Sequence, residues 1–491
     1  MAKKKTAAPA PAPAGAVLDL KEAAEFLKVS KPTFYRWLAE GKIKGAKVGQ
    51  QWRFQRQDLE SFLHTDPTAM PAEVEGFHAA IDADRAARKL GPFPWSERGA
   101  DEGEVPQFVS SFMEDAVRSI ASDIHLDVDR QAARLRYRID GVLHEVLAFP
   151  KEAAKAVVAR CKLLGDMDIN ERRIPQNGRI RFAVEDREYD FRLVTVPAIY
   201  GESMIMRILD QGSVLLGLDR LGMSESMRAR LEERLRDPNG LFVVVGPAGS
   251  GRTTTVYSAL HHLNAPEKKI VTIEDPVEYA MKGLMQVHVN RKLGFLPAVG
   301  LRTFVRCDPD IIMLYELRDL ETAEVCVTAA MTGHLVLTTM LGSDAVSAIA
   351  RLTDMGLEPL LVASSLSTVV AQRLVRRVCE HCREKYQPSR DLVRRMEADT
   401  GLDLAQATFA RGRGCTTCRQ TGYKGRFAMF ELLALDQPLR DLIARPASIT
   451  ELRDAARTAG MITLLQDGVE KAAAGRTTLE EVIRVLSAGR E

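Results

Sequence analysis

The sequence predicts a multidomain α/β protein, and three observations lead to that fold class. The chain has 491 residues, too many for one hydrophobic core and enough for three or four domains. From Leu218 onward, apolar runs such as "LFVVVG" and "IIMLY" alternate with helical patterns, which indicates buried parallel strands joined by helices. Before Leu218, one segment reads as short helices with a hairpin and the next as alternating strands. We therefore expect a large parallel α/β domain preceded by two smaller ones.

The composition is that of a soluble protein with no overall preference for polyanions. Lys and Arg total 68 and Asp and Glu 66, so the net charge is +2 and any nucleic-acid surface must be local. No apolar run approaches the ~18 residues that a membrane-spanning helix needs. Residues 1–16 carry three lysines and then Ala-Pro repeats, without the apolar core of a signal peptide. We expect a disordered tail there and a cytoplasmic protein.

Residues 17–64 predict a winged helix-turn-helix. Ala23, Ala24 and Leu27 have helical spacing, and a second short helix runs from Pro32 to a stop at Gly41. "KGAKVGQQWRF" then indicates a β-hairpin, and "RQDLESFL" a closing helix. With these elements, the module resembles the excisionase/MerR-like DNA-binding family.

The same module has two possible roles. If it binds DNA, the second helix enters the major groove and the hairpin reaches a phosphate or the minor groove. The residues expected to do so are Lys31, Thr33, Tyr35 and Arg36 on or near the helix and Arg53 on the hairpin. The alternative is that the fold serves as a protein-docking domain, because the module is only mildly basic.

Further domain boundaries follow from changes of pattern. Residues 65–104 contain linker-like stretches such as "GPFPW" and "SERGADEGE", with one short helix near residues 77–90. Residues 105–212 combine helices with alternating strands, which predicts a small α+β domain. Residues 213–491 form the large domain, with a cysteine-rich element at residues 379–418 and helices up to the C-terminus.

In the large domain, "GPAGSGRTTTVY" follows a buried strand and opens a helix. Such a turn points backbone N–H groups into one small space that binds phosphate, and a hydroxyl at Thr253 is placed to bind Mg²⁺. The general pattern has lysine where this chain has Arg252. The residues expected to contact the nucleotide here are Gly246, Pro247, Ala248, Gly249, Ser250, Gly251, Arg252, Thr253 and Thr254.

Three further polar positions accompany strands of this domain. Glu274 and Asp275 follow one strand, and Glu316 follows another, where a carboxylate can orient a metal-bound water or act as a base. His334 directly precedes a third strand. Each of these alone is compatible with a purely structural role, but the ordered set favours a nucleotide site.

Beyond these residues, the chain resembles the type II secretion and type IV pilus assembly ATPases, called traffic ATPases, from about Val105 to the C-terminus. The resemblance rests on segments such as "RYRIDGVL", "RIPQNGRI", "TIEDPVEY", "GLRTFVRCDPDIIM", "TGHLVLTT" and "GCTTCRQTGYKGRFAMFELL". It implies a RecA-like P-loop core and a cytoplasmic homo-hexamer peripheral to the inner membrane. There, ATP with Mg²⁺ drives a platform protein for pilus assembly or secretion.

The resemblance also assigns residues. It makes residues 246–254 the Walker A loop, Glu274 and Asp275 the Asp box, Glu316 the Walker B acid and His334 the His box. Catalytic roles are thereby expected for Glu316, Glu274, His334 and Arg252. Arg192 and Arg207 of the α+β domain are expected to approach the nucleotide phosphates.

The chain departs from the family pattern around one phosphate. Arg252 replaces lysine, Tyr315 replaces the glycine before the Walker B acid, and Leu341 and Gly342 replace a histidine and a threonine. These changes affect hydrolysis more than binding. The alternatives are therefore a DNA-binding regulatory or scaffold protein with a weakly hydrolysing nucleotide site, and an inactive subunit that mixes with an active paralogue.

The cysteines predict a metal site. The chain has seven, of which Cys379, Cys382, Cys415 and Cys418 form two C-x-x-C pairs separated by 32 residues. Four thiolates suit a tetrahedral structural Zn²⁺ and leave no open coordination position for catalysis. A redox role for one pair is the weaker alternative.

Overall fold

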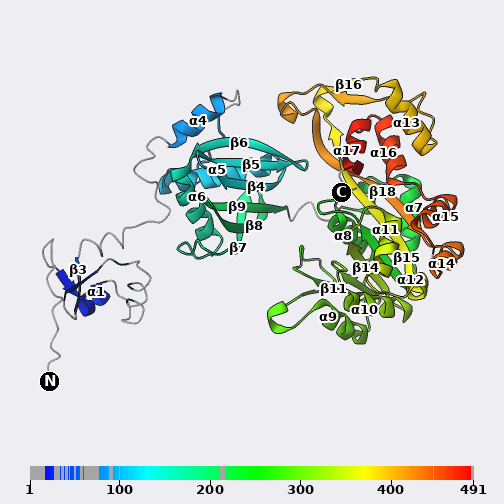
Figure 1. The fold of residues 1–491 in the computed structure, drawn as a ribbon, viewed down its shortest axis with the longest axis horizontal. Coiled ribbons are helices and arrows are strands. Elements are labelled where there is room, and N and C mark those ends of the chain that lie inside the picture. The colour runs from blue at the N-terminus through cyan, green and yellow to red at the C-terminus, as the bar shows by residue number, and fades with distance from the viewer. Residues whose placement is uncertain are drawn as a thin grey trace. The chain divides into compact units, whose positions relative to one another are not determined.

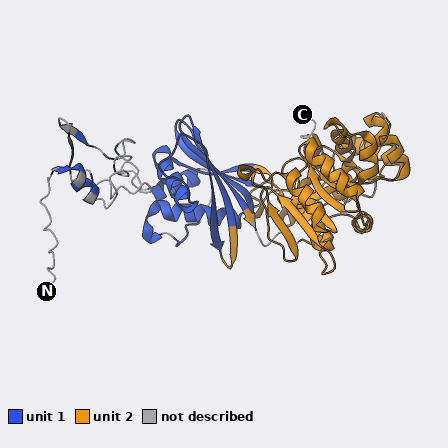
Figure 2. Cartoon of the chain, turned by 90° about the horizontal axis from the view of Figure 1, so that it is seen from below, with its two compact units in different colours: residues 1–139, 143–184, 190–208 blue, residues 140–142, 185–189, 209–491 orange. Residues whose placement is uncertain are grey.

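The structure is a computed structural model that describes residues 17–26, 34, 38, 43, 45–48, 51–55, 59, 77–87, 92–98, 100–210, 216–445 and 447–487. The chain divides into two compact units, which have different colours in Figure 2. The first comprises residues 1–139, 143–184 and 190–208, and the second comprises residues 140–142, 185–189 and 209–491. Within the described ranges, no helix combines the length and the apolar character needed to cross a membrane.

The N-terminal module contains a small antiparallel sheet of order β1-β3-β2 and a helix, α1. Asp19 and Glu22 exchange side-chain-to-backbone hydrogen bonds of 2.9 Å at the start of α1, a reciprocal cap. Phe34 and Phe54 are fully buried and meet edge to face. The expected first helix and hairpin are confirmed, whereas most of the second and closing helices lies outside the described residues. The bounds are β1 (Val17–Asp19), α1 (Leu20–Phe26), β2 (Ala46–Val48) and β3 (Gln51–Gln55).

The rest of the first unit is an α+β domain with a six-stranded sheet of order β6-β5-β4-β9-β8-β7. Its helix α5 presents Phe108, Phe112 and Met113 to the core, where all three are fully buried. The bounds are α5 (Glu104–Arg118), β4 (Ala121–Val128), β5 (Ala132–Ile139), β6 (Val142–Pro150), α6 (Lys151–Leu164), β7 (Gln176–Val184), β8 (Arg187–Ala198) and β9 (Gly201–Asp210).

The short helix expected near residues 77–90 is confirmed, but it packs into the core of the α+β domain rather than lying in a linker. Helix α4 (Phe77–Ala87) buries Phe77 completely, and its ring packs edge to face against Phe108 and Phe149 at 5.1 and 5.5 Å. Phe93 is also buried and lies in the same aromatic cluster. Pro92 and Pro94, which suggested a linker, instead flank Phe93, whose buried ring belongs to the core of the α+β domain.

The second unit is built on a seven-stranded sheet of order β12-β11-β13-β14-β10-β15-β18. Its first six strands are parallel, and β18 is antiparallel at the edge. Strands β10, β11, β13 and β14 are buried along their whole length, which explains their continuous apolar sequences. The bounds are β10 (Gly240–Val245), β11 (Ile270–Glu274), β12 (Leu284–His288), β13 (Ile311–Leu314), β14 (Leu335–Met340), β15 (Leu366–Val378) and β18 (Tyr423–Ala434).

Helices cover both faces of this sheet, as Figure 1 shows, and each face has its own apolar cluster. Leu231 of α7 and Leu260 of α8 belong to one cluster, and Leu301 of α9 and Ile349 of α11 to the other. This is the RecA-like arrangement that the sequence predicts. The bounds are α7 (Glu225–Leu235), α8 (Arg252–Leu263), α9 (Pro297–Phe304), α10 (Leu320–Met331), α11 (Ala345–Asp354), α12 (Pro359–Ser365), α13 (Arg390–Thr400), α14 (Gln437–Ile443), α15 (Ile449–Thr458), α16 (Leu464–Ala473) and α17 (Leu479–Ser487).

Glu431 of β18 joins the starts of two of these helices. Its carboxylate is buried and accepts hydrogen bonds from the backbone N–H of Ala345, at 2.8 Å, and of Leu464, at 3.2 Å. These are the first residues of α11 and α16, whose free N–H groups favour a negative charge. Burial raises the pKa of Glu431 against the lowering effect of these bonds. One side chain therefore satisfies two helix ends that are far apart in the sequence.

Candidate functional site

The turn between β10 and α8 has the shape of a phosphate cradle. Gly249 and Gly251 have φ values of 75° and 90°, a left-handed conformation that other residues rarely adopt. A side chain at Gly251 would meet the Gln372 amide nitrogen at 2.6 Å, and one at Gly246 would meet the Gln372 carbonyl oxygen at 2.7 Å. The glycines are thus required both by the backbone conformation and by the closeness of β15.

The same turn leaves a polar atom without a partner. Ser250 is 3% exposed, and its hydroxyl oxygen makes no hydrogen bond to any residue that the structure describes. Helix α8 runs for twelve residues behind it and directs its first N–H groups into the turn. A buried hydroxyl without a partner at a helix N-terminus fits a phosphate group, so the residues of this turn suit the phosphates of ATP.

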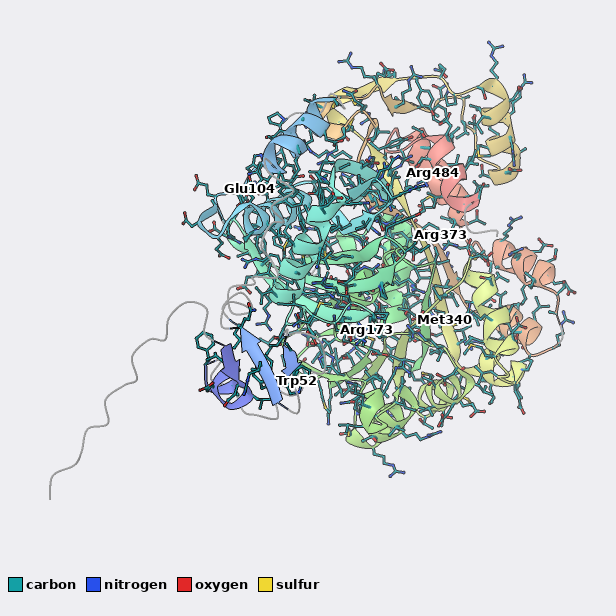
Figure 3. All side chains as sticks on the ribbon, turned by 60° about the vertical axis from the view of Figure 1, so that its left-hand side comes forward. Trp52, Glu104, Arg173, Met340, Arg373 and Arg484 are labelled. Carbon is teal, nitrogen blue, oxygen red and sulfur yellow. The ribbon has the colours of Figure 1, made fainter. Side chains whose placement is uncertain are left out.

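Arg252, the first residue of α8, reaches across to the end of β14. Its guanidinium donates a 2.6 Å hydrogen bond to the carbonyl oxygen of Met340 and lies 3.9 Å from the Glu316 carboxylate. Burial lowers the pKa of Arg252, and the charge of Glu316 opposes that effect. The guanidinium remains charged, because its ordinary pKa lies far above neutrality. Figure 3 labels Met340 on β14 and Arg373 on β15, the two strands that flank β10.

Glu316 follows β13 and is held by two arginines. Besides Arg252, Arg318 donates to it at 2.7 Å. Glu316 is only 10% exposed at its side chain, so these two cations balance its charge. The neighbouring Tyr315 extends its hydroxyl to within 3.4 Å of the Thr253 hydroxyl. The structure therefore brings Arg252, Thr253, Tyr315 and Glu316 together at the carboxyl ends of β10, β13 and β14.

Glu274 lies at the end of β11 and is 1% exposed. Its carboxylate accepts hydrogen bonds from Tyr257, from Thr272 at 2.6 Å and from Gln286 at 3.2 Å. Burial raises the pKa of Tyr257, and the charge of Glu274 adds to the effect. These three partners were missed by the sequence analysis, because hydrogen-bond donors in apolar strands and helices leave no local signal.

Asp275 is more exposed and faces a cavity. It accepts a 2.8 Å hydrogen bond from Arg291. The cavity has a volume of about 340 Å³ and includes Tyr315, Glu316 and Arg318 in its lining. This hollow at the carboxyl ends of β11 and β13 gives Glu316 a route to solvent and to a water molecule.

Gln372 on β15 is a further site residue that the sequence analysis missed. It is buried, its amide nitrogen faces Gly251, and its oxygen accepts a 2.6 Å hydrogen bond from Thr255 of α8. The one available signal was a glutamine within the apolar run "TVVAQRLV". Gln372 fixes the phosphate turn against the neighbouring strand.

The expected catalytic role of His334 is not supported by its position. His334 precedes β14, whereas the phosphate turn follows the parallel strand β10, in which Gly240 pairs with Leu335. The six residues of β14 span roughly 20 Å, so His334 lies at the opposite edge of the sheet. Its Nδ1 is 3.0 Å from the carbonyl oxygen of Ala329, in the last turn of α10. This position gives His334 a capping role at the end of α10.

The chain segment after β14 carries the other departures from the family pattern. Leu341 is 38% exposed, and a side chain at Gly342 would meet Val245 of β10 at 2.5 Å. Arg373 is buried and donates to the carbonyl oxygen of Ser343 at 2.7 Å. Leu341 offers no polar group to a nucleotide, and Gly342 is explained by packing.

The arginines predicted in the first unit are on adjacent strands. Arg192 lies on β8 and Arg207 on β9, where Arg207 donates a 2.9 Å hydrogen bond to Asp123. Their approach to phosphates stays a prediction. Of the residues expected to contact DNA, Arg53 lies on β3 and is half-buried, while Lys31, Thr33, Tyr35 and Arg36 lie outside the described residues.

The four paired cysteines come together as expected. The sulfur atoms of Cys379 and Cys415 are 3.9 Å apart and those of Cys382 and Cys418 are 3.8 Å apart, and all four lie within 4.8 Å of one another. A disulfide would need about 2.05 Å, whereas a tetrahedron of sulfurs around Zn²⁺ has edges of about 3.8 Å. Cys382 and Cys418 end the short helices Glu380–Cys382 and Thr416–Cys418, and Cys379 and Cys415 directly precede these helices. Along the chain, β16 (Arg383–Lys385) follows the first helix and β17 (Ala410–Gly412) precedes the second. This donor set fits a structural zinc ion.

The chain is similar to known proteins over most of its length. The family described as Type II/IV secretion system protein matches residues 98–484, and a helix-turn-helix domain family matches residues 17–66. The type II secretion system protein HxcR of Pseudomonas aeruginosa is 42% identical over 431 residues, which cover 87% of this chain and 88% of HxcR. The type IV pilus assembly ATPase PilB of Thermus thermophilus is 43% identical over 386 residues, which cover 78% of this chain and 43% of PilB.

Two solved structures share the fold. The pilus retraction motor PilT with bound ADP has a TM-score of 0.52 and 24% identity, and the alignment covers 76% of this chain and 96% of PilT. The ATPase DotB of Legionella pneumophila has a TM-score of 0.56 and 18% identity, and the alignment covers 78% of this chain and 95% of DotB. Since the family match and the relatives at more than 40% identity both span most of the sequence, the chain belongs to the type II/IV secretion system protein family.

Proposed function

We propose that this chain is a Mg²⁺-dependent ATPase that powers type II protein secretion or type IV pilus assembly. It works as a homo-hexamer in the cytoplasm, against a platform protein of the inner membrane. The family membership supports this activity, and relatives carry the names type II secretion system protein and type IV pilus assembly ATPase. The single observation that carries the proposal is the Ser250 hydroxyl, which has no hydrogen-bond partner among the described residues and lies in the glycine turn that leads to Arg252, 3.9 Å from Glu316.

Each residue of the site then has a task. The backbone N–H groups of residues 246–254 hold the phosphates, and the Thr253 hydroxyl binds Mg²⁺. Glu316 orients the attacking water or accepts its proton, since it lies on the wall of the cavity at the strand ends. Arg252 supplies the positive charge that lysine provides in the general pattern.

A phosphate-release assay on the purified full-length chain with ATP and Mg²⁺ tests the proposal. The wild type should turn over continuously, and Glu316→Gln should lower kcat by about 10²- to 10⁴-fold while keeping its affinity for a fluorescent ATP analogue. Glu321→Gln is the matched control, because Glu321 lines the same cavity but is largely exposed and paired with Arg302. A wild type that binds the analogue and releases no phosphate would favour the regulatory or scaffold alternative.

The tetracysteine cluster holds a structural Zn²⁺ in this proposal. All four of its thiols are free, and no catalytic position remains open on a metal with four sulfur ligands. The ion would fasten the element between β15 and β18, where a short two-stranded sheet alone is marginally stable.

A second function, DNA binding by the N-terminal module, is favoured by the helix-turn-helix family match and by the described β2–β3 hairpin. A hexamer would carry six copies and gain avidity. Fluorescence anisotropy with duplex DNA should show salt-dependent binding by the full chain that is lost on deletion of residues 1–64. Binding that survives this deletion, or no binding at low salt, would assign the module to protein docking.

A further inference from the structure

Tyr315 is fixed in place by its backbone. Its N–H donates to the carbonyl oxygen of Ile273 on β11 at 3.1 Å, and its own carbonyl oxygen accepts a hydrogen bond from the Thr339 side chain of β14. The backbone of Tyr315 is therefore tied to both neighbouring strands in the bend that directly follows β13.

That side chain faces α8 rather than Glu316. Tyr315 packs against the apolar cluster formed with α7 and α8, whereas Glu316, the next residue, meets Arg252 and Arg318. Both residues line the cavity at the strand ends, so what separates them is their contacts. A change at position 315 can thus alter the space beside Thr253 while the ion pairs of Glu316 remain.

The phenol oxygen lies 3.4 Å from the Thr253 hydroxyl oxygen. Mg²⁺ needs oxygen ligands at about 2.0–2.1 Å in a nearly regular octahedron, so adjacent ligands are about 3 Å apart. A Mg²⁺ ion bound to the Thr253 hydroxyl would need the space around that oxygen for its other ligands, and the phenol would compete for this space. A neutral phenol is a poor substitute for the waters and phosphate oxygens that Mg²⁺ retains.

We propose that Tyr315 is a specificity residue that competes with Mg²⁺ for the Thr253 hydroxyl and thereby sets the metal dependence of nucleotide binding. This inference rests on the proposed function, because it requires a nucleotide in the 246–254 turn. Nucleotide would bind through the backbone N–H groups and Arg252, and Mg²⁺ would reach the Thr253 hydroxyl only when the phenol leaves it. The chain consequently needs more free Mg²⁺ than the same site would need with a small residue at position 315.

The test measures binding of a fluorescent ATP analogue to the full-length chain, first with EDTA and then across a Mg²⁺ titration. Wild type, Tyr315→Phe and Tyr315→Ala should bind alike in EDTA. The half-saturating Mg²⁺ concentration should fall about tenfold in Tyr315→Ala and between about two- and tenfold in Tyr315→Phe, since one neutral hydrogen bond is removed. Tyr386→Phe is the control, because Tyr386 is also half-buried but bonds to Glu480 at a distance from the turn.

The possible failures are distinguishable. If the half-saturating Mg²⁺ concentration is the same in wild type and both variants, the inference is wrong while nucleotide binding stands. If the wild type binds no analogue in either condition, the proposed function fails first. Thermal unfolding without nucleotide checks that each variant folds, and Tyr315→Phe, which keeps the ring, carries the test if Tyr315→Ala does not fold.

Discussion

The guanidinium of Arg252 is hydrogen-bonded to the carbonyl oxygen of Met340, at 2.6 Å, so the first residue of α8 is tied to the last residue of β14. The same guanidinium lies 3.9 Å from Glu316. Its charge is therefore engaged by groups of the protein. A nucleotide phosphate has to draw it away from them, and Glu316 then keeps Arg318 as its remaining partner.

Substitutions of Arg252 separate its charge from its shape. Arg252→Ala removes a cation beside the developing negative charge, and we expect kcat/KM for ATP to fall about 10²- to 10³-fold. Arg252→Lys keeps the charge at a shorter reach and should stay within about tenfold of the wild type. Steady-state phosphate release measures both, with Arg302→Ala, which affects an exposed ion pair, as control. Equal losses in the Ala and Lys variants would show that the forked guanidinium, rather than its charge, is required.

Tyr257→Phe should destabilise the second unit. The buried Glu274 carboxylate loses one of its three side-chain donors, which costs about 1–3 kcal/mol for a buried group left short of a partner. The midpoint of chemical unfolding measures the change. Tyr200→Phe, at an exposed tyrosine, is the control and should leave the midpoint where it is. Identical midpoints for Tyr257→Phe and wild type would mean that Thr272 and Gln286 suffice.

Metal analysis should find one zinc ion per chain. Cys382→Ser removes one of four sulfur ligands, so we expect the zinc to be lost and the thermal unfolding temperature to fall. Cys307→Ser is the matched control, because Cys307 is a half-exposed free cysteine outside the cluster. A chain that contains no zinc, or a Cys382→Ser variant that keeps it, would contradict the assignment.

The buried Glu481 should make stability depend on acid pH. Burial would raise its pKa, but hydrogen bonds from Arg484 and Arg376 outweigh that and hold the pKa below its usual 4.5. A carboxyl with a depressed pKa in the folded state stabilises the fold above its unfolded pKa, and the stabilisation is lost as the pH falls through the folded value.

Glu481→Gln should therefore lower the unfolding free energy at pH 7 by about 3 kcal/mol, the usual cost of breaking a buried pair. The difference from wild type should begin to shrink as the pH falls below the ordinary pKa of 4.5, and it should vanish only below the lower folded pKa, where both side chains are neutral. Urea unfolding at several pH values measures it. A difference that stays constant from pH 7 to pH 3 would assign the effect to packing rather than charge.

The phosphate turn could be predicted because its requirements are local. Its glycines, hydroxyls and flanking apolar strand lie within one short stretch, and Gly251 has the left-handed conformation that a turn into a helix needs. The two cysteine pairs were predictable for a similar reason, since the spacing within each pair already fits one metal ion.

His334 shows why the positions of other site residues could not be predicted from their order along the chain. It precedes a strand, whereas Glu274 and Glu316 follow theirs, and the two ends of a parallel strand lie at opposite edges of the sheet. Gln372 and Tyr257 were missed because their partners are brought close only by the fold. The short helix with Phe77 was expected, but its place in the core was not, because the contacts of Phe77, Phe108 and Phe149, lie farther along the chain.

Glu431 limits how far the chain can be shortened from its C-terminus. One of its carboxylate oxygens accepts a hydrogen bond from the N–H of Ala345, and the other accepts one from the N–H of Leu464. Ala345 follows shortly after β14, the strand whose last residue, Met340, is bonded to Arg252. A chain truncated after β18 would expose that buried carboxylate and lose α16, whose Leu464 N–H is one of its two backbone donors. The helices after β18 therefore belong to the core of the second unit, and a shortened chain has to extend at least through α16 to keep both donors.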